Sequence, residues 1–215
     1  MPPHAPEFSD DFRADLARLF AWRRDVRHFR TDPLPDGALE ELLHLASLAP
    51  SVGNAQPWRF VRVKSAVLRE TLAGHVDAEA ERAGARYAPG DRKTLYHSLK
   101  LHGLREAPEI VAVYSDEAPG AGFGLGIATM PEALRYSTVM AIHSLWLAAR
   151  AADIGVGWVS IVDPAKVSEL LSVQPSWHFM ALLCIGYADA ASTVPELERR
   201  GWQGRDDWPG NIIDR

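Results

Sequence analysis

The sequence has very little cysteine: Cys184 is the single thiol among 215 residues. One thiol excludes an intramolecular disulfide framework and a cysteine-rich zinc site, and it fits a reducing compartment. No apolar run approaches the roughly 20 residues of a membrane span. Residues 1–11 carry prolines and acidic residues where a secretory signal would carry basic and apolar ones. We therefore expect a cytoplasmic protein without membrane contact.

An excess of positive charge is also missing. The chain has 23 Lys and Arg residues against 28 Asp and Glu residues, a net charge of −5. Such a balance lacks the basic footprint that binds nucleic acid without regard to sequence. Hydrophobic residues make up 47% and charged residues 24%, which is ordinary for a globular chain. The length predicts one domain spanning residues 1–215.

Both helices and strands are expected from the hydrophobic periodicity. The helical segments are 9–22, 37–48, 66–106 with a break at 88–90, 136–153, and a short helix after Asp163; the strands are 58–64, 110–114, 156–162 and 179–187. The segment 136–153 is apolar nearly all round, so we expect it to be buried on every side at the centre of a subunit interface.

Two segments are expected to lie outside this framework. The stretch 118–131 is rich in Gly, Ala and Pro and is longer than most connections. Together with the charged segment before it, this stretch suggests a lid region at about 85–130. Residues 190–215 are polar but include tryptophan, which predicts an anchored C-terminal extension.

An arginine cluster follows the first predicted helix, at Arg23, Arg24 and Arg27. Guanidinium groups bind phosphate through paired hydrogen bonds, so three of them in an acidic protein indicate a site for one anionic group. A solvated helix end, where cations complement the helix dipole, explains the cluster equally well. Asp25 within it is either an internal salt-bridge partner or a functional carboxylate.

Two further loops contain small and polar residues. Ser51, Asn54 and Gln56 lie between a helix and a strand, where hydroxyl and amide groups could pair with the polar edge of a planar ring. A capped turn is the alternative. The stretch Gly-Val-Gly-Trp-Val-Ser at 155–160 would expose backbone donors and ends in the hydroxyl of Ser160. It lacks the spacing of a dinucleotide fingerprint.

Other motifs carry less weight. Tyr96 and Lys100 have the Tyr-x-x-x-Lys spacing of short-chain dehydrogenases, but no Gly-rich strand-to-helix turn precedes them. His97 and His102 are five apart, which is not the helical spacing of two metal ligands, and we expect no metal site. No Gly-x-Ser-x-Gly elbow exists, and Cys184 lies in an apolar strand, so hydrolase chemistry is disfavoured.

Several of these stretches together resemble the 5,6-dimethylbenzimidazole synthases (BluB), the flavin-destroying branch of the nitroreductase-like superfamily. The matching stretches are Arg-Arg-Asp-Val-Arg at 23–27, Ala-Pro-Ser-Val-Gly-x-x-Gln-Pro-Trp at 49–58, Ser-Leu-Lys-Leu-x-Gly at 98–103, Tyr-Ser-Thr-Val at 136–139, Gly-Val-Gly-Trp-Val-Ser-Ile at 155–161 and Pro-Glu-Leu-Glu at 195–198. The wider superfamily usually has Ser where Asp25 stands.

The resemblance implies an α+β, nitroreductase-like fold in which a central mixed sheet is flanked by helices. It also implies an intertwined homodimer with FMN at the subunit interface. The FMN-binding residues would be Arg23, Arg24, Asp25, Val26, Arg27, Ser51, Asn54, Gln56, Lys100, Trp158 and Val159. Asp25 would act as acid/base, kept ionised by the arginines around it, and Ser160 would position the intermediate.

The reaction implied is the oxygen-dependent fragmentation of reduced FMN (FMNH2) to 5,6-dimethylbenzimidazole, the lower ligand of cobalamin, and erythrose 4-phosphate. A separate flavin reductase could supply the FMNH2. One alternative is a flavoprotein that keeps its FMN and passes hydride from NAD(P)H to a nitroaromatic or quinone; a flavin-binding or flavin-storage protein without catalysis is another. The sequence departs from the branch at Asn54, His102, His143 and Tyr114, positions that would cover or support the flavin.

Overall fold

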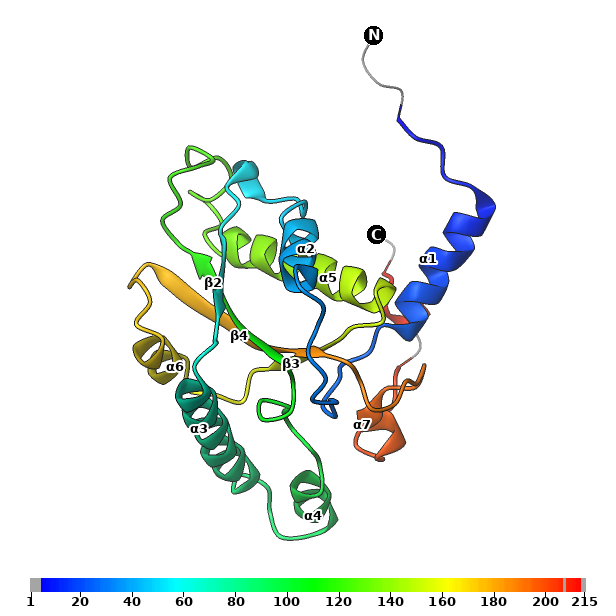
Figure 1. Ribbon diagram of the computed structural model, residues 1–215, viewed down its shortest axis with the longest axis vertical. Helices are drawn as coiled ribbons and strands as arrows, with labels where there is room; N and C mark the ends of the chain where they lie inside the picture. The colour runs from blue at the N-terminus through cyan, green and yellow to red at the C-terminus, as the bar shows by residue number, and fades with distance from the viewer. Residues whose placement is uncertain (1–4, 207, 214–215) are drawn as a thin grey trace.

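A computed structural model describes residues 5–206 and 208–213 and shows a four-stranded sheet between two groups of helices (Figure 1). The strands are β1 (Trp58–Arg62), β2 (Glu109–Asp116), β3 (Gly155–Val159) and β4 (Trp177–Gly186), in the order β1-β2-β4-β3. Neighbouring strands pair antiparallel. A parallel bridge from Asp25 to Val156, at the outer edge of β3, gives the mixed sheet its parallel component.

The helices lie close to their predicted positions. They are α1 (Asp10–Trp22), α2 (Ala38–Ala46), α3 (Ala66–Gly84), α4 (Asp91–His97), α5 (Ala133–Ala151), α6 (Pro164–Leu170) and α7 (Glu196–Arg199), with short 3-10 turns η1 (Val52–Asn54) and η2 (Trp208–Asn211). The hydroxyl of Ser9 and the carboxylate of Asp163 accept from backbone N–H groups at the starts of α1 and α6. Among the differences from the prediction, residues 98–106 are not helical, β3 ends at Val159, and α7 lies in a segment for which no helix was predicted.

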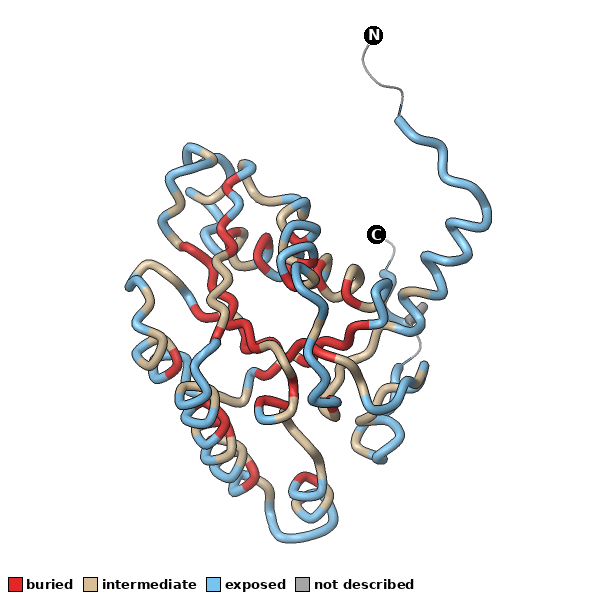
Figure 2. Tube along the Cα trace, viewed as in Figure 1, coloured by how far each residue is buried: buried red, intermediate tan, exposed pale blue. Residues whose placement is uncertain are grey.

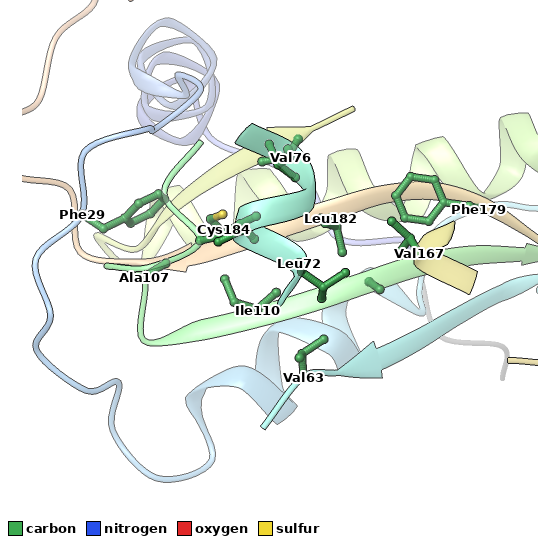
Figure 3. Close-up of a cluster of buried hydrophobic side chains, with 14 of the residues drawn as sticks. Phe29, Val63, Leu72, Val76, Ala107, Ile110, Val167, Phe179, Leu182 and Cys184 are labelled. Carbon is green, nitrogen blue, oxygen red and sulfur yellow. The ribbon is translucent and has the colours of Figure 1, made fainter. Parts of the chain in front are cut away.

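Alternation along the inner strands divides the core into two halves. Successive side chains of a strand point to opposite faces, so Ile110 and Ala112 of β2 face α3 and α6, whereas Val111 and Val113 face α2 and α5. Figure 3 shows the first of these clusters, in which Leu72 and Val76 of α3 lie over the sheet. Both faces of β2 and β4 are therefore covered by helices, and only the outer edges of β1 and β3 are left.

Helix α5 is not covered on every side within the single chain, so its burial at a subunit interface stays a prediction. Its inner face packs on the sheet through residues such as Ile142 and Leu145. Its outer face leaves Tyr136 53%, Val139 40% and Met140 41% exposed. These residues and the exposed His143 have the i, i+3, i+4, i+7 spacing of one helix face, so an apolar stripe remains uncovered.

The two ends of the chain pack differently. Helix α1 projects from the body and has no buried residue (Figure 2), although Phe20 stacks on His143 of α5. The C-terminal segment is held by its own chain: Arg92 donates to the Trp202 carbonyl at 2.7 Å and lies over the indole ring. In the described part of the chain, no helix is long and apolar enough to cross a membrane.

Candidate functional site

The arginine-rich segment runs along the free edge of β3. The N–H of Val26 donates to the Val156 carbonyl at 3.1 Å, and the N–H of Trp158 donates to Asp25 Oδ1 at 2.8 Å. A Cβ on Gly157 would lie 2.0 Å from the Val26 carbonyl oxygen, so only glycine allows this approach. The glycines of the 155–160 stretch therefore bring the Asp25 carboxylate against the sheet.

The three guanidinium groups diverge, which corrects the expectation that all of them surround Asp25. Arg24 donates to the Thr193 carbonyl at 2.8 and 2.5 Å. Arg23 lies 5.0 Å from the ring centroid of Trp146. Arg27 alone of the three contacts the carboxylate, through Nε to Asp25 Oδ2 at 2.9 Å.

The pKa of Asp25 shifts in the opposite direction to the one expected from the sequence. Burial raises the pKa of this carboxyl because the charged form loses hydration; the Trp158 N–H and Arg27 act against the rise, and the charge of Glu196 adds to it. A carboxyl with a raised pKa can take up and release a proton closer to neutral pH than an ordinary aspartate.

A fourth arginine completes the cluster, and sequence reasoning missed it. Arg205, in the C-terminal segment, lines a cavity of about 150 Å³ together with Arg23, Arg24, Asp25, Arg27, Pro195, Glu196 and Leu197. Its charge helps to lower the pKa values of Arg23 and Arg24, after the larger effect of burial. A lone arginine in a polar tail has no periodic pattern that could have singled it out.

The charge of this cavity fits an anionic group. Four arginines face two carboxylates, those of Asp25 and Glu196. Among the described residues, the buried Nε of Arg23 has no hydrogen-bond partner, and a buried donor without a partner is costly. A phosphate, with its strong acceptor oxygens, would satisfy both the charge and the donor.

A larger cavity lies on the same segment. Its volume is about 470 Å³, and it shares Arg24, Asp25, Arg27 and Glu196 with the smaller one. Its other walls come from α5, from β3, from the segment after β4 and from the end of α7. They include Trp146, Arg150, Val156, residues 188–192, Arg199 and Arg200. Asp25 therefore lines both cavities.

The Ser51 loop is built from unusual backbone conformations. Gly53, Asn54 and Gln56 have φ values of 54°, 55° and 48°, in the left-handed region that non-glycine residues rarely adopt. Ser51 Oγ accepts from the Gln56 N–H at 3.0 Å, which closes the loop. Strain of this kind collects at functional sites, and the side chains of Asn54 and Gln56 are exposed.

The loop 120–127 packs on the Ser51 loop. A Cβ on Gly53 would lie 2.8 Å from the Leu125 carbonyl oxygen, and a Cβ on Gly122 would lie 2.9 Å from the Ala55 Cβ. The N–H of Val52 also donates to Ser137 Oγ of α5 at 3.0 Å. The Gly-rich part of the expected lid region thus lies against a predicted flavin loop.

The structure places the Ser51 loop far from Asp25. The loop leads into β1, whereas Asp25 lies beyond β3 at the opposite edge of the sheet. Three strand spacings separate β1 from β3, or about 14 Å. Because helices cover both faces of the strands between them, one chain does not bring the two groups together around one ring.

The remaining predicted residues lie partly at the Asp25 edge. Backbone groups of alternate residues point to opposite sides of a strand. Those of Trp158 therefore face the free edge, while those of Val159 face β4. The side chain of Ser160 is exposed just after β3. Lys100 pairs with Glu106 at 2.7 Å and lines a different cavity, but its carbonyl accepts from Arg27 at 3.4 Å.

Thiol and metal chemistry have little support in the structure. Burial raises the pKa of the Cys184 thiol to about 12, so the reactive thiolate is not formed near neutral pH. In residues 5–206 and 208–213, no group of three or more His, Cys, Asp or Glu side chains is placed to hold a metal ion.

Comparison with known proteins shows the family of the chain. The nitroreductase family model matches residues 20–187. A 5,6-dimethylbenzimidazole synthase of Rhodospirillum rubrum is 53% identical over 200 residues, 93% of this chain and 94% of its own. A synthase of the same name from Rhodobacter capsulatus is 46% identical over 91% and 94% of the two chains.

Solved structures share the fold. An iodotyrosine deiodinase with FMN and 3-iodo-L-tyrosine superposes with a TM-score of 0.72 at 24% identity, over 93% of this chain and 97% of its own. A BluB-like flavoprotein from Clostridium difficile 630 gives a TM-score of 0.68 at 16% identity, over 94% and 98%.

The family match and the two synthases define a flavin-dependent oxidoreductase, and the solved structures share its α+β fold. The chain belongs to the nitroreductase family, in its 5,6-dimethylbenzimidazole synthase branch.

Proposed function

We propose that the protein makes 5,6-dimethylbenzimidazole, the lower ligand of cobalamin, by oxygen-dependent fragmentation of reduced FMN, with erythrose 4-phosphate as the second product. The observation that carries the proposal is the Asp25 carboxylate, which is partly buried, tied to the free edge of β3 and set in the wall of an arginine cavity. The high identity to the synthases of the two relatives supports it.

Arg23, Arg24 and Arg205 would hold the phosphate of FMN. The unpartnered Nε of Arg23 and the excess positive charge of the cavity are the features that a phosphate would satisfy. The carbonyl of Trp158, at the outer edge of β3, would accept a hydrogen bond from the flavin ring, because the N–H of the same residue already donates to Asp25. When bound, reduced FMN supplies the ring, the ribityl carbons and the electrons that dioxygen consumes.

Asp25 would move the proton that fragmentation requires. Oδ1 and Oδ2 each accept one hydrogen bond from the protein, and an ionised carboxylate has about four acceptor positions. The remaining positions can receive a proton from a group in the cavity. Ser160, beyond the end of β3, would hold the reacting group by its hydroxyl.

A second copy of the chain would complete each site. The Ser51 loop and the Asp25 edge lie on opposite sides of one sheet, so the loop would contact the flavin held by the partner chain. The uncovered stripe of Tyr136, Val139, Met140 and His143 on α5 offers an apolar surface for that contact. The loop 120–127, which packs on the Ser51 loop, would then act as a lid over the neighbouring site.

One assay tests this function. Chemically reduced FMN and air are supplied to the purified protein, and the products are separated by chromatography. We expect 5,6-dimethylbenzimidazole to appear. NAD(P)H oxidation with a nitro compound is measured in parallel, because NAD(P)H consumption without benzimidazole would favour the reductase that keeps its FMN.

A further inference from the structure

The Asp25 carboxylate is held at both of its oxygens, from two different elements. Trp158, in β3, donates its backbone N–H to Oδ1 at 2.8 Å, and Arg27 donates Nε–H to Oδ2 at 2.9 Å. The two side chains are partly buried, 31% exposed for Asp25 and 18% for Arg27. Two hydrogen bonds from fixed donors restrict rotation of the carboxylate about its own bond axis.

Arg27 is itself held in place. Its Nη1 donates to the Lys100 carbonyl at 3.4 Å. The segment that follows Lys100 passes close by, since a Cβ on Gly103 would lie 3.1 Å from the Arg27 carbonyl oxygen. Arg24 and Arg23, by contrast, direct their guanidinium groups to the Thr193 carbonyl and the Trp146 ring.

We propose that Arg27 is a positioning residue, which fixes the orientation and the ionisation of the Asp25 carboxylate instead of binding the FMN phosphate. This inference rests on the proposed function, in which Asp25 moves a proton. It assigns two roles to the arginine segment. Arg23 and Arg24, which line the small cavity, would bind the anionic group, and Arg27 positions the carboxylate of Asp25.

Several charged groups face Asp25, and they act in both directions. Arg27, on the same segment, favours the ionised form, as does the N–H of Trp158, whereas Glu196 of α7 disfavours it. Arg23, Arg24 and Arg205 line the same small cavity; burial lowers the pKa of Arg23, and the charge of Asp25 acts to raise it. Cys184 of β4 stays neutral because burial raises its pKa to about 12. Removing Arg27 takes away the one cation in direct contact, so the pKa of Asp25 should rise further.

The first test uses the flavin-free protein. The carboxyl of Asp25 is titrated by carbon-13 NMR, with its signal identified by its loss in Asp25→Asn. We expect Arg27→Gln to raise the pKa of Asp25 by about one unit or more, the size typical of losing an opposite charge at this distance. Arg24→Gln removes a charge on the neighbouring residue that does not touch the carboxylate, so it should give a clearly smaller shift.

A conservative variant separates charge from geometry. Arg27→Lys keeps the positive charge and should keep most of the lowering of the Asp25 pKa, while its single ammonium cannot also reach the Lys100 carbonyl. The proposal is overturned if Arg27→Gln leaves the pKa of Asp25 unchanged, or if Arg24→Gln shifts it as much. If Arg27→Gln does not fold, Arg27→Met, which also removes the charge but keeps an unbranched side chain, takes its place in the same comparison.

The second test is kinetic. In Arg27→Gln, the acidic limb of the pH–rate profile for benzimidazole formation should move to higher pH by the shift seen in NMR, and kcat should fall with KM for FMNH2 changed less than about threefold. A raised KM with unchanged kcat would make Arg27 a phosphate ligand and overturn the proposal. If the unaltered protein makes no benzimidazole, the proposed function fails, but the NMR titration still decides the role of Arg27.

Discussion

The two outer edges of the sheet carry different kinds of site. At the β3 edge, side chains make the contacts: Asp25 with Trp158, Arg24 with Thr193, and Arg27 with Lys100 join segments far apart in the sequence. At the Ser51 loop, which leads into β1, the contacts are close and uncharged: Gly53 packs on the carbonyl of Leu125, the Val52 N–H donates to Ser137 Oγ, and positive φ angles shape the loop. One edge is organised to hold charge, and the other to present a close, neutral surface.

This difference fits a ligand with a charged end and a flat neutral end. A phosphate needs fixed cations, and a ring needs backbone groups and small residues at close range. Since one chain keeps the two edges about 14 Å apart, the comparison suggests that a partner chain brings the second edge to the first. The following changes test the two edges separately and then together.

The largest effect is expected at Asp25. Asp25→Asn keeps an oxygen for the Trp158 N–H but cannot move a proton, so benzimidazole formation should fall by about 10²–10⁴-fold. The rate is measured by chromatography with reduced FMN in excess. Circular dichroism and FMN titration serve as controls for folding and binding. An unchanged rate would remove Asp25 from the mechanism.

The next largest effect is expected on stability, where the arginine-rich segment packs against β3. Gly157→Ala places a methyl group where the Val26 carbonyl lies, and it should lower the free energy of unfolding by about 1–3 kcal/mol. Urea denaturation measures the change. Gly204→Ala is a matched control, because a Cβ there meets no atom within 4 Å. Equal stability of the two variants would contradict the close approach.

Much of the framework could be predicted from the sequence, because local chemistry determines it. Ser9 and Asp163 begin helices as caps, and strand alternation divides the core. Less of the candidate site could be predicted from the sequence. Nothing local distinguishes Arg27 from Arg23 and Arg24, and their directions depend on Thr193, Trp146 and Lys100, which are distant in sequence.

The strand order and the exposed face of α5 are two further features that the sequence does not determine. The resemblance implies that the Ser51 loop and Asp25 contact one flavin, but their separation follows from β1 and β3 taking opposite edges, which no motif encodes. The exposed stripe on α5 cannot be told from a buried one in the sequence, because apolar residues on all sides of a helix look alike whether the cover is the same chain or another.

A smaller effect is expected at Arg205. Arg205→Gln removes one cation from the small arginine cavity, so under the proposed function the dissociation constant for FMN should rise about tenfold, near the low end of the range for a hydrogen bond to a charged group. Fluorescence titration of FMN measures it, at two salt concentrations. Arg18→Gln, which removes a charge paired with Asp15 on α1, is the control. If both variants bind FMN like the unaltered protein, Arg205 is not a ligand.

The smallest signal comes from mixing two inactive chains. Asp25→Asn damages the β3 edge, and Gly53→Val damages the Ser51 loop, since Gly53 has a φ of 54° and no room beside Leu125. If each site joins the edges of two chains, remixed dimers contain one intact site in half of the molecules and recover about a quarter of the full rate. Recovery is measured after co-refolding. No recovery, with dimers confirmed by sedimentation, would place both edges in one chain.

The unpartnered Nε of Arg23 has a consequence for how long the protein lasts. A ligand that satisfies it adds stability in proportion to the logarithm of its concentration over its dissociation constant. Under the proposed reaction, that ligand is also the material consumed. Each turnover would then return the chain to its less stable form until another flavin arrives, so flavin supply would govern protein lifetime as well as product output.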